Sequence, residues 1–185
     1  MWLNRFIQHN NFKSFAIYFY IMKTSHVIRT MQQTNEKASR AFNQADYQKA
    51  VECYSKALQL CSSLPENVKF DKVKFEAIVQ SGLSAAFGRQ GKHMESFAAA
   101  NKALVFFDKI GELDAVEIGR YLMAQVNQGT ALAALGCLQA ALDALYKAKD
   151  VFNCKGLDPV KNRQWLEMVE GNIAVIKEQI KKHQG

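Results

Sequence analysis

The sequence predicts an all-helical protein built from repeated helical hairpins. Only two prolines, Pro65 and Pro159, interrupt 185 residues of which about half are hydrophobic, so long helices can form almost everywhere. Segments with a similar pattern recur three times along the chain, and their small and large residues fall on one helical face. We therefore expect about three helix pairs followed by one further C-terminal helix.

Each of the three segments follows a turn and carries the same helical pattern. A small residue is followed four positions later by Tyr54, Ala100 or Leu145, and three positions after that by Ala57, Ala103 or Ala148. Small side chains let two helices approach closely, and a large residue one turn away fills the space beside them. Another such pair precedes each turn: Ala38 with Ala41, Ser84 with Phe87, and Gly129 with Leu132. This pattern predicts antiparallel pairs joined by short loops.

These anchors resemble the tetratricopeptide repeat (TPR) family, which implies a right-handed superhelix of helix pairs. The matching residues are Tyr47, Ala50, Tyr54, Ala57, Leu83, Ser84, Phe87, Gly91, Ala103, Gly129, Leu132, Gly136, Ala141 and Ala148. On this basis the repeats are expected at residues 31–64, 66–110 and 112–153. The anchor alanines at 57, 103 and 148 are 46 and 45 residues apart, whereas the family repeat is about 34 residues long. The chain is therefore similar to a long-helix variant found in small bacterial TPR-like proteins.

The first thirty residues form an N-terminal extension in this interpretation. Their apolar run from Phe15 to Met22 is eight residues long, too short to cross a bilayer, and no A-x-A-like cleavage site follows it. The segment is expected to be an amphipathic helix that docks on the body or on a membrane surface, or a loosely ordered extension. Met22 and Met31 are alternative start positions.

Residues 158–183 are expected to form a helix that caps the array. Asp158 is a good N-cap with Pro159 at the first helical position, and the array needs a cover for its last apolar face. The predicted packing stripe consists of Trp165, Val169, Ile173, Ile176 and Ile180.

No catalytic motif, metal-ligand spacing or cofactor-binding motif occurs in the sequence, so we expect neither an enzyme nor a cofactor. Cys53, Cys61, Cys137 and Cys154 are predicted to be reduced and largely packed, which favours a cytoplasmic location. Of the net charge of +7, residues 1–30 supply +4 and the body +3. Because acids and bases alternate in the body, nucleic-acid binding is not expected. Glu112, Asp114 and Glu117 are interpreted as the negative first turn of a helix.

The TPR resemblance implies a concave groove lined by the first helix of each pair, where a protein or peptide partner would bind. The expected groove residues are Gln32, Asn35, Ser39, Asn43, Ser81, Arg89, Met123, Asn127 and Thr130. One branch of the family grips the C-terminal carboxylate of chaperones with basic residues and asparagine. The matching positions here carry Asn35, Ser39, Gly82, Met123 and Asn127, which include no cation, so this mode of binding is not expected.

The sequence thus favours a non-catalytic scaffold that binds a peptide or helix in a groove. The alternative is a structural protein that forms homo-oligomers through Phe106, Phe107 or the aromatic N-terminal segment, with the groove unused or self-filled.

Overall fold

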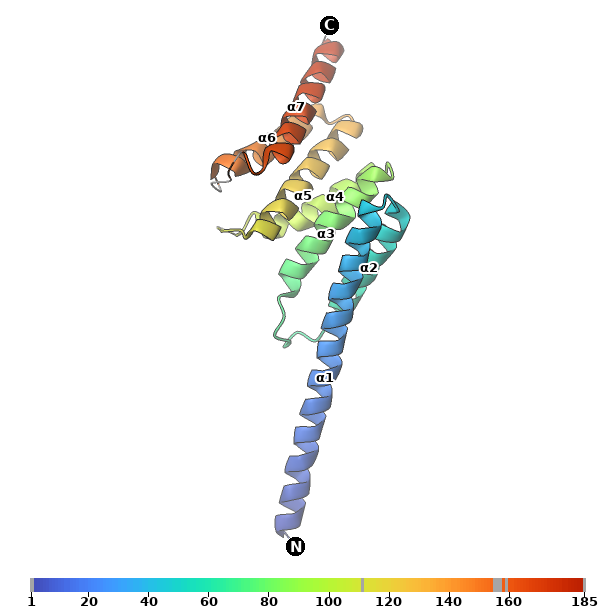
Figure 1. Cartoon of the computed structure of the whole chain (residues 1–185), viewed down its shortest axis with the longest axis vertical. Helices are drawn as coiled ribbons and strands as arrows, with labels where there is room; N and C mark the ends of the chain where they lie inside the picture. Colours follow the sequence, from blue (N-terminus) through green and yellow to red (C-terminus); the bar gives the residue numbers. More distant parts are fainter. Residues whose placement is uncertain (1, 111, 155–157, 159, 185) are drawn as a thin grey trace.

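The computed structural model describes the backbone of residues 2–110, 112–154, 158 and 160–184 and the side chains of residues 22–110, 112–152, 158 and 160–183. This part of the chain contains seven helices and no strand, which confirms the predicted all-α fold (Figure 1). The helices are α1 (Trp2–Asn43), α2 (Tyr47–Ser62), α3 (Lys72–Arg89), α4 (His93–Phe107), α5 (Ala115–Ala134), α6 (Leu138–Cys154) and α7 (Arg163–Gln184).

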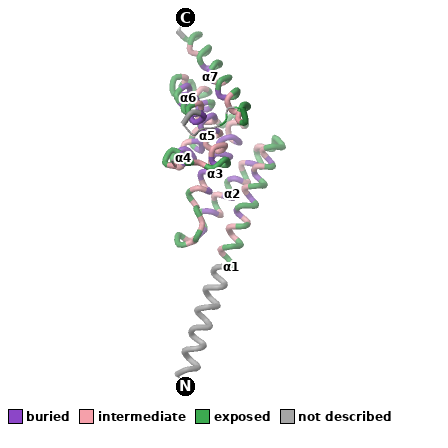
Figure 2. Tube along the Cα trace, turned by 60° about the vertical axis from the view of Figure 1, so that its left-hand side comes forward, coloured by how far each residue is buried: buried purple, intermediate pink, exposed green. Residues whose placement is uncertain are grey.

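The helices form three hairpins stacked in chain order, with α7 at the end of the stack (Figure 1). Within each hairpin, α1 packs on α2, α3 on α4, and α5 on α6. Neighbouring hairpins meet through α2 with α3, α3 with α5, and α4 with α5, while α7 packs on α6 and α5. Buried positions therefore lie on the sides of the helices that face one another inside the stack (Figure 2).

Each hairpin turn uses the same backbone geometry. Ala45, Gly91 and Gly136 adopt left-handed conformations with φ of 60°, 72° and 80°. In each case the amide of the next residue donates to a carbonyl five positions earlier: Asp46 N to Ala41 O at 2.9 Å, Lys92 N to Phe87 O at 3.0 Å, and Cys137 N to Leu132 O at 2.9 Å. This is the Schellman arrangement that ends a helix and satisfies its last carbonyls.

Two glycines allow the first helices of the second and third hairpins to pack directly on large side chains. A Cβ atom at Gly82 would collide with the ring of Tyr54 on α2. A Cβ at Gly129 would lie 2.7 Å from Cγ of Leu145 on α6. The anchor alanines Ala57, Ala103 and Ala148 are all 0% exposed, which confirms their predicted place in the helix interfaces.

The apolar core consists of three clusters along the array. The first joins α1, α2 and α3 around Met31, Tyr54 and Val79. The last joins α5, α6 and α7 around Leu122, Leu145 and Val169. A smaller cluster with Phe107 at its centre connects α3, α4 and α5 between them. Each hairpin thus depends on its neighbours for burial, as stacked repeats do.

The long repeat results from both helices and connections. Helices α3 and α5 have 18 and 20 residues, and residues 63–71 and 108–114 connect one hairpin to the next. Helix α1 has 42 residues and is continuous across residue 30, where the sequence suggested that an extension ends. Of the apolar run before it, only Met22 lies within the described side chains, and it is 55% exposed.

The C-terminal helix begins later than the sequence suggested. Asp158 accepts hydrogen bonds from Val160 N at 2.9 Å and Lys161 N at 3.5 Å, and so caps a turn before α7, which begins at Arg163. Pro159 lies outside the described residues. The stripe itself packs as expected: Val169, Ile173 and Ile176 are buried, and Trp165 and Ile180 pack against the same cluster.

Because the hairpin turns share one backbone geometry, substitutions at the equivalent positions 45 and 136 should change the stability in opposite directions. Ala45→Gly should raise the free energy of unfolding by roughly 0.5–1 kcal/mol, because alanine is strained at positive φ, whereas Gly136→Ala should lower it by about 1 kcal/mol. Urea unfolding followed by circular dichroism measures both changes. A loss of stability in Ala45→Gly would contradict the assigned turn conformation.

Candidate binding groove

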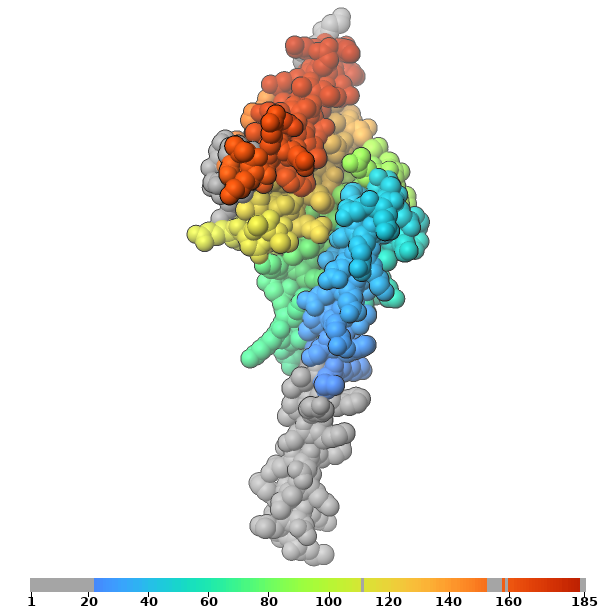
Figure 3. Space-filling view, in the orientation of Figure 1, coloured from blue at the N-terminus to red at the C-terminus, as the bar shows by residue number. Residues whose placement is uncertain are grey.

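Two adjoining hollows form a groove on one face of the array. The larger, of about 470 Å³, is lined by residues of α1, α3, α4, α5 and α7. The smaller, of about 170 Å³, is lined by residues of α1, α2, α3 and α5. Phe42, Ala85 and Met123 line both hollows and join them into one surface. Figure 3 shows the helices around this face, with α1 in blue, α5 in yellow and α7 in orange-red.

The groove combines an apolar centre, which is the surface of Phe42, Ala85 and Met123 that both hollows share, with polar side chains around it. Phe42, Met123, Trp165 and Met168 supply large apolar side chains, and Met168 is 46% exposed. The polar side chains that line the two hollows are Ser39, Asn43, Tyr54, Arg89, His93, Ser96, Arg120, Asn127, Thr130 and Asn172. Apolar surface with a few directed hydrogen-bonding groups is typical of ligand sites.

Most of the predicted groove residues come together here. Arg89, Met123, Asn127 and Thr130 line the larger hollow, and Ser39, Asn43 and Met123 line the smaller one. Gln32 and Asn35 lie nearer the N-terminus of α1 and line neither hollow. Gln32 is exposed, whereas Asn35 is half-buried and its Oδ1 is a buried atom without a hydrogen-bond partner.

Ser81 has a different place. It is 0% exposed, and its hydroxyl donates to the carbonyl of Arg120 at 2.7 Å, so it joins α3 to α5 beneath the groove. Ser81 therefore belongs to the interface between α3 and α5 and not to the lining of the groove. Helical spacing alone does not distinguish a serine that faces a neighbouring helix from a serine that faces the groove.

The floor of the groove is held by hydrogen bonds among small polar residues. Asn127 Nδ2 donates to Ser84 Oγ at 3.0 Å, and Ser84 Oγ donates to Ser81 O at 2.7 Å. From α4, Ser96 Oγ donates to Ser84 O at 2.9 Å. These contacts connect α3, α4 and α5 with groups that are satisfied within the protein, so the floor is positioned before any ligand arrives.

Sequence reasoning missed the contribution of α7 and of Arg120. Trp165 was expected only to pack in the core, but it also lines the larger hollow together with Met168 and Asn172. Nothing in the repeat pattern specifies the angle at which a capping helix crosses its neighbours. Arg120 lies one turn before Met123 on α5, outside the matched positions, and lines the smaller hollow, while its carbonyl accepts the Ser81 hydroxyl.

The sequence matches a known family model over residues 26–164, under the description "Domain of Unknown Function (DUF3856)". The chain belongs to this family. Two curated relatives are Protein unc-45 homolog B of Xenopus laevis, 35% identical over 137 residues, and that of Xenopus tropicalis, 33% identical over 135 residues. These matches cover 74% and 73% of this chain but only 12% of each relative.

Solved structures show the same fold as this DUF3856 chain. A TPR-like protein from Chlorobium tepidum TLS aligns with a TM-score of 0.75 at 22% identity, over 84% of this chain and 99% of that one. The Sgt2 TPR domain from Aspergillus fumigatus aligns at 0.58 and 19% identity, over 83% of this chain and 81% of that one. The C-terminal TPR-containing domain of a putative FK506-binding protein from Plasmodium falciparum aligns with a TM-score of 0.62 at 17% identity, over 87% of this chain and 95% of that one. The fold is therefore TPR-like.

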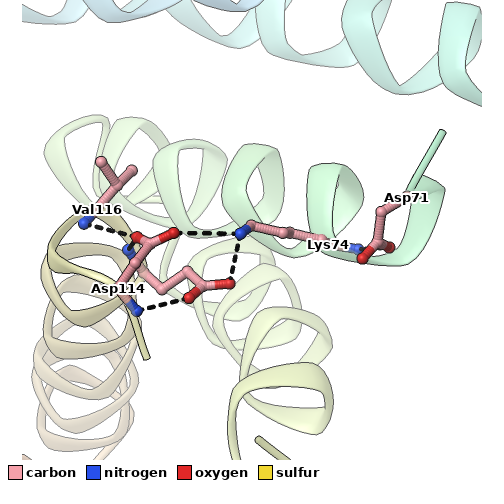
Figure 4. A network of polar contacts seen from close by, with 5 residues as sticks. Asp71, Lys74, Asp114 and Val116 are labelled. Atoms are coloured by element: carbon pink, nitrogen blue, oxygen red, sulfur yellow. Dashed lines mark hydrogen bonds and ion pairs between the residues drawn. The ribbon is translucent and has the colours of Figure 1, made fainter. Parts of the chain in front are cut away.

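Of the three carboxylates expected in the first turn of a helix, Asp114 and Glu117 form the N-terminal cap of α5 and share one further partner, whereas Glu112 lies before the cap (Figure 4). Asp114 Oδ1 accepts from Val116 N and Glu117 N, both at 2.9 Å, and Glu117 Oε2 accepts from Asp114 N at 2.7 Å. Lys74 on α3 lies 3.2 Å from Asp114 Oδ2 and 2.8 Å from Glu117 Oε1. This ion pair joins the starts of α3 and α5, away from the groove.

The thiols differ in environment. Cys61 is buried, and this burial, with Glu76 nearby, raises its pKa to about 11. Cys53 is half-buried, whereas Cys137 is exposed, so the expectation that the cysteines are largely packed is wrong for Cys137. The side chain of Cys154 lies outside the described residues. Within the described part of the chain, no helix is long and apolar enough to cross a membrane.

The ion pair at Lys74 should make stability depend on pH. Backbone hydrogen bonds and Lys74 lower the pKa of Asp114 in the folded protein below its ordinary value of 3.8. The ionised carboxylate therefore stabilises the fold above pH 3.8, and this stabilisation is lost as the pH falls through the pKa of the folded state. Lys74→Met should lower the melting temperature at pH 7, and the difference from wild type should shrink at strongly acid pH. Lys56→Met, which removes an exposed and unpaired lysine within the described structure, is the matched control.

Thermal unfolding at several pH values measures this effect. A Lys74→Met deficit that stays constant down to acid pH would show that packing of the lysine stem, rather than its charge, stabilises the protein.

Proposed function

We propose that this chain is a non-catalytic scaffold that binds a segment of a protein partner in the groove between α1, α3, α5 and α7. The observation that supports the proposal best is the continuous apolar surface of Phe42, Ala85 and Met123, which joins two hollows and is bordered by amides and hydroxyls. TPR-like arrays present such surfaces for protein recognition, and an open groove suits a peptide or a single helix. The cytoplasmic location stays a prediction.

The groove offers two kinds of contact. The larger hollow, of about 470 Å³, has room for a large apolar side chain and offers it the apolar side chains of Phe42, Met123, Trp165 and Met168. Asn43 lines the smaller hollow and Asn172 the larger one, and their amides can donate to and accept from a peptide backbone there. Asn127 is already bonded to Ser84 and contributes mainly to the shape of the floor.

Binding of a chaperone C-terminus by a carboxylate clamp is not part of this proposal. The matching positions include Asn35, whose Oδ1 is buried, and Ser39, whose hydroxyl lies 3.2 Å from the Tyr54 hydroxyl. Neither side chain carries the charge that would strengthen a bond to a carboxylate.

Self-association is the second candidate, and one surface favours it. A hollow of about 520 Å³ between α3 and α4 is lined by Val73, Val105 and Phe106, and both valines are about 60% exposed. Phe107 is 1% exposed and packs in the core, so it cannot serve as the contact that the sequence suggested. The two candidates therefore use different surfaces and can be separated.

Matched substitutions on the two surfaces test the proposal. Met123→Glu places a charge at the centre of the groove and should abolish capture of partner proteins from a cell extract, whereas Val105→Glu on the other surface should not. Circular dichroism shows whether each variant is folded, and sedimentation velocity reports its oligomeric state.

Partner capture lost only in Val105→Glu, together with a wild-type dimer that this variant dissociates, would favour self-association. Equal capture by all three proteins would contradict the groove as the binding site.

A further inference from the structure

The charged side chains that line the groove are of one sign. Arg89 lines the larger hollow and Arg120 lines the smaller one, whereas no described aspartate or glutamate lines either. Within the described part of the chain, neither arginine forms an ion pair, although Lys74, Lys149, Lys161 and Arg163 do. Two arginines beside an apolar surface with no acidic neighbour favour an anionic ligand.

The two arginines line different hollows, Arg89 the larger and Arg120 the smaller, and the two hollows meet at the apolar centre. The backbone of Arg120 lies beside Ser81, whose hydroxyl donates to the Arg120 carbonyl, and Arg89 lies eight residues after Ser81 along α3. Eight residues of helix rise about 12 Å, which is the length of roughly four residues of extended peptide. Phe42, Ala85 and Met123 belong to both hollows.

From this arrangement we infer the class of segment that the groove accepts, an inference that rests on the proposed function. We propose that the groove binds an acidic segment of a protein partner in which two carboxylate side chains, about four residues apart, enclose a large apolar residue. The carboxylates pair with Arg120 and Arg89, and the apolar residue occupies the centre beside Met123.

This ligand differs from a C-terminal peptide and from nucleic acid. Both anionic groups are side chains, so no free C-terminal carboxylate is required. The apolar surface between the arginines would be left uncovered by a phosphate backbone, and neither Lys23 nor Arg29, the N-terminal cations whose side chains are described, lines the groove. An acidic and apolar peptide satisfies both features at once.

Fluorescence anisotropy with synthetic peptides tests the inference on the full chain. The probes are nine-residue peptides, acetylated and amidated, with glutamates four positions apart and leucine, phenylalanine or methionine between them. At least one should bind with a dissociation constant in the micromolar range, and Arg89→Gln or Arg120→Gln should weaken it roughly tenfold each, because each removes a charge-assisted bond. Arg40→Gln, an exposed arginine that lines neither hollow, should have little effect.

Several results would overturn the inference while leaving groove binding intact. One is equal affinity for probes in which glutamine replaces both glutamates, with binding still lost in Met123→Glu. Another is binding only of peptides with a free C-terminal carboxylate. Failure of all three probes at about 1 mM, or a preference for a single-stranded oligonucleotide with steep salt dependence, would also overturn it.

Discussion

The architecture depends on how closely α3 and α5 approach the large side chains of neighbouring helices. Gly82 faces Tyr54 and Gly129 faces Leu145 with no room for a Cβ atom. These contacts fix the distance between α2 and α3 and between α5 and α6. The buried alanines at 57, 103 and 148 are small enough for the helices that carry them to pack closely on their neighbours. Because packed interiors tolerate little added volume, one glycine in each interface sets the position of a whole helix.

The groove is a consequence of this packing. Tyr54 is held between Gly82 on α3 and Ser39 on α1, and its ring forms one wall of the smaller hollow. On the other side, the bond from Asn127 to Ser84 and the bond from Ser81 to Arg120 keep α5 against α3. The same small residues that allow close packing therefore also leave the space that Phe42 and Met123 border. Helix α7 completes this surface with Trp165 and Met168.

The fold could be predicted from the sequence because its signals are local and repeated. The anchors Ala57, Ala103 and Ala148 recur at nearly constant spacing. Gly91 and Gly136 mark the turns, because the positive φ of these positions favours glycine. Ala45 occupies the equivalent turn without being a glycine, so alignment with the other repeats, rather than residue type, identified it. The packing stripe of α7 was equally readable, although its start was misplaced because Asp158 caps a turn and not the helix.

The site was only partly predictable, because it depends on angles between helices. Six of the nine predicted groove residues line the hollows, since the first helix of each pair faces them. Ser81 instead turns toward α5, and the residues of α7 enter the groove by a crossing that no local pattern specifies. The ion pair of Lys74 with Glu117 joins residues 43 positions apart in the sequence and likewise could not be foreseen.

A comparison of two glycines on the same helix tests the central claim most directly. Gly129→Ala should lower the free energy of unfolding by about 1–3 kcal/mol, because the new methyl group would press on Leu145 and on the Ala141 carbonyl. Gly119→Ala, where nothing lies within 4 Å, should be neutral or should raise it by up to about 1 kcal/mol through helix propensity. Equal effects of the two substitutions in urea unfolding would contradict the account, because they would show that the close approach of α5 and α6 is not what positions the helices.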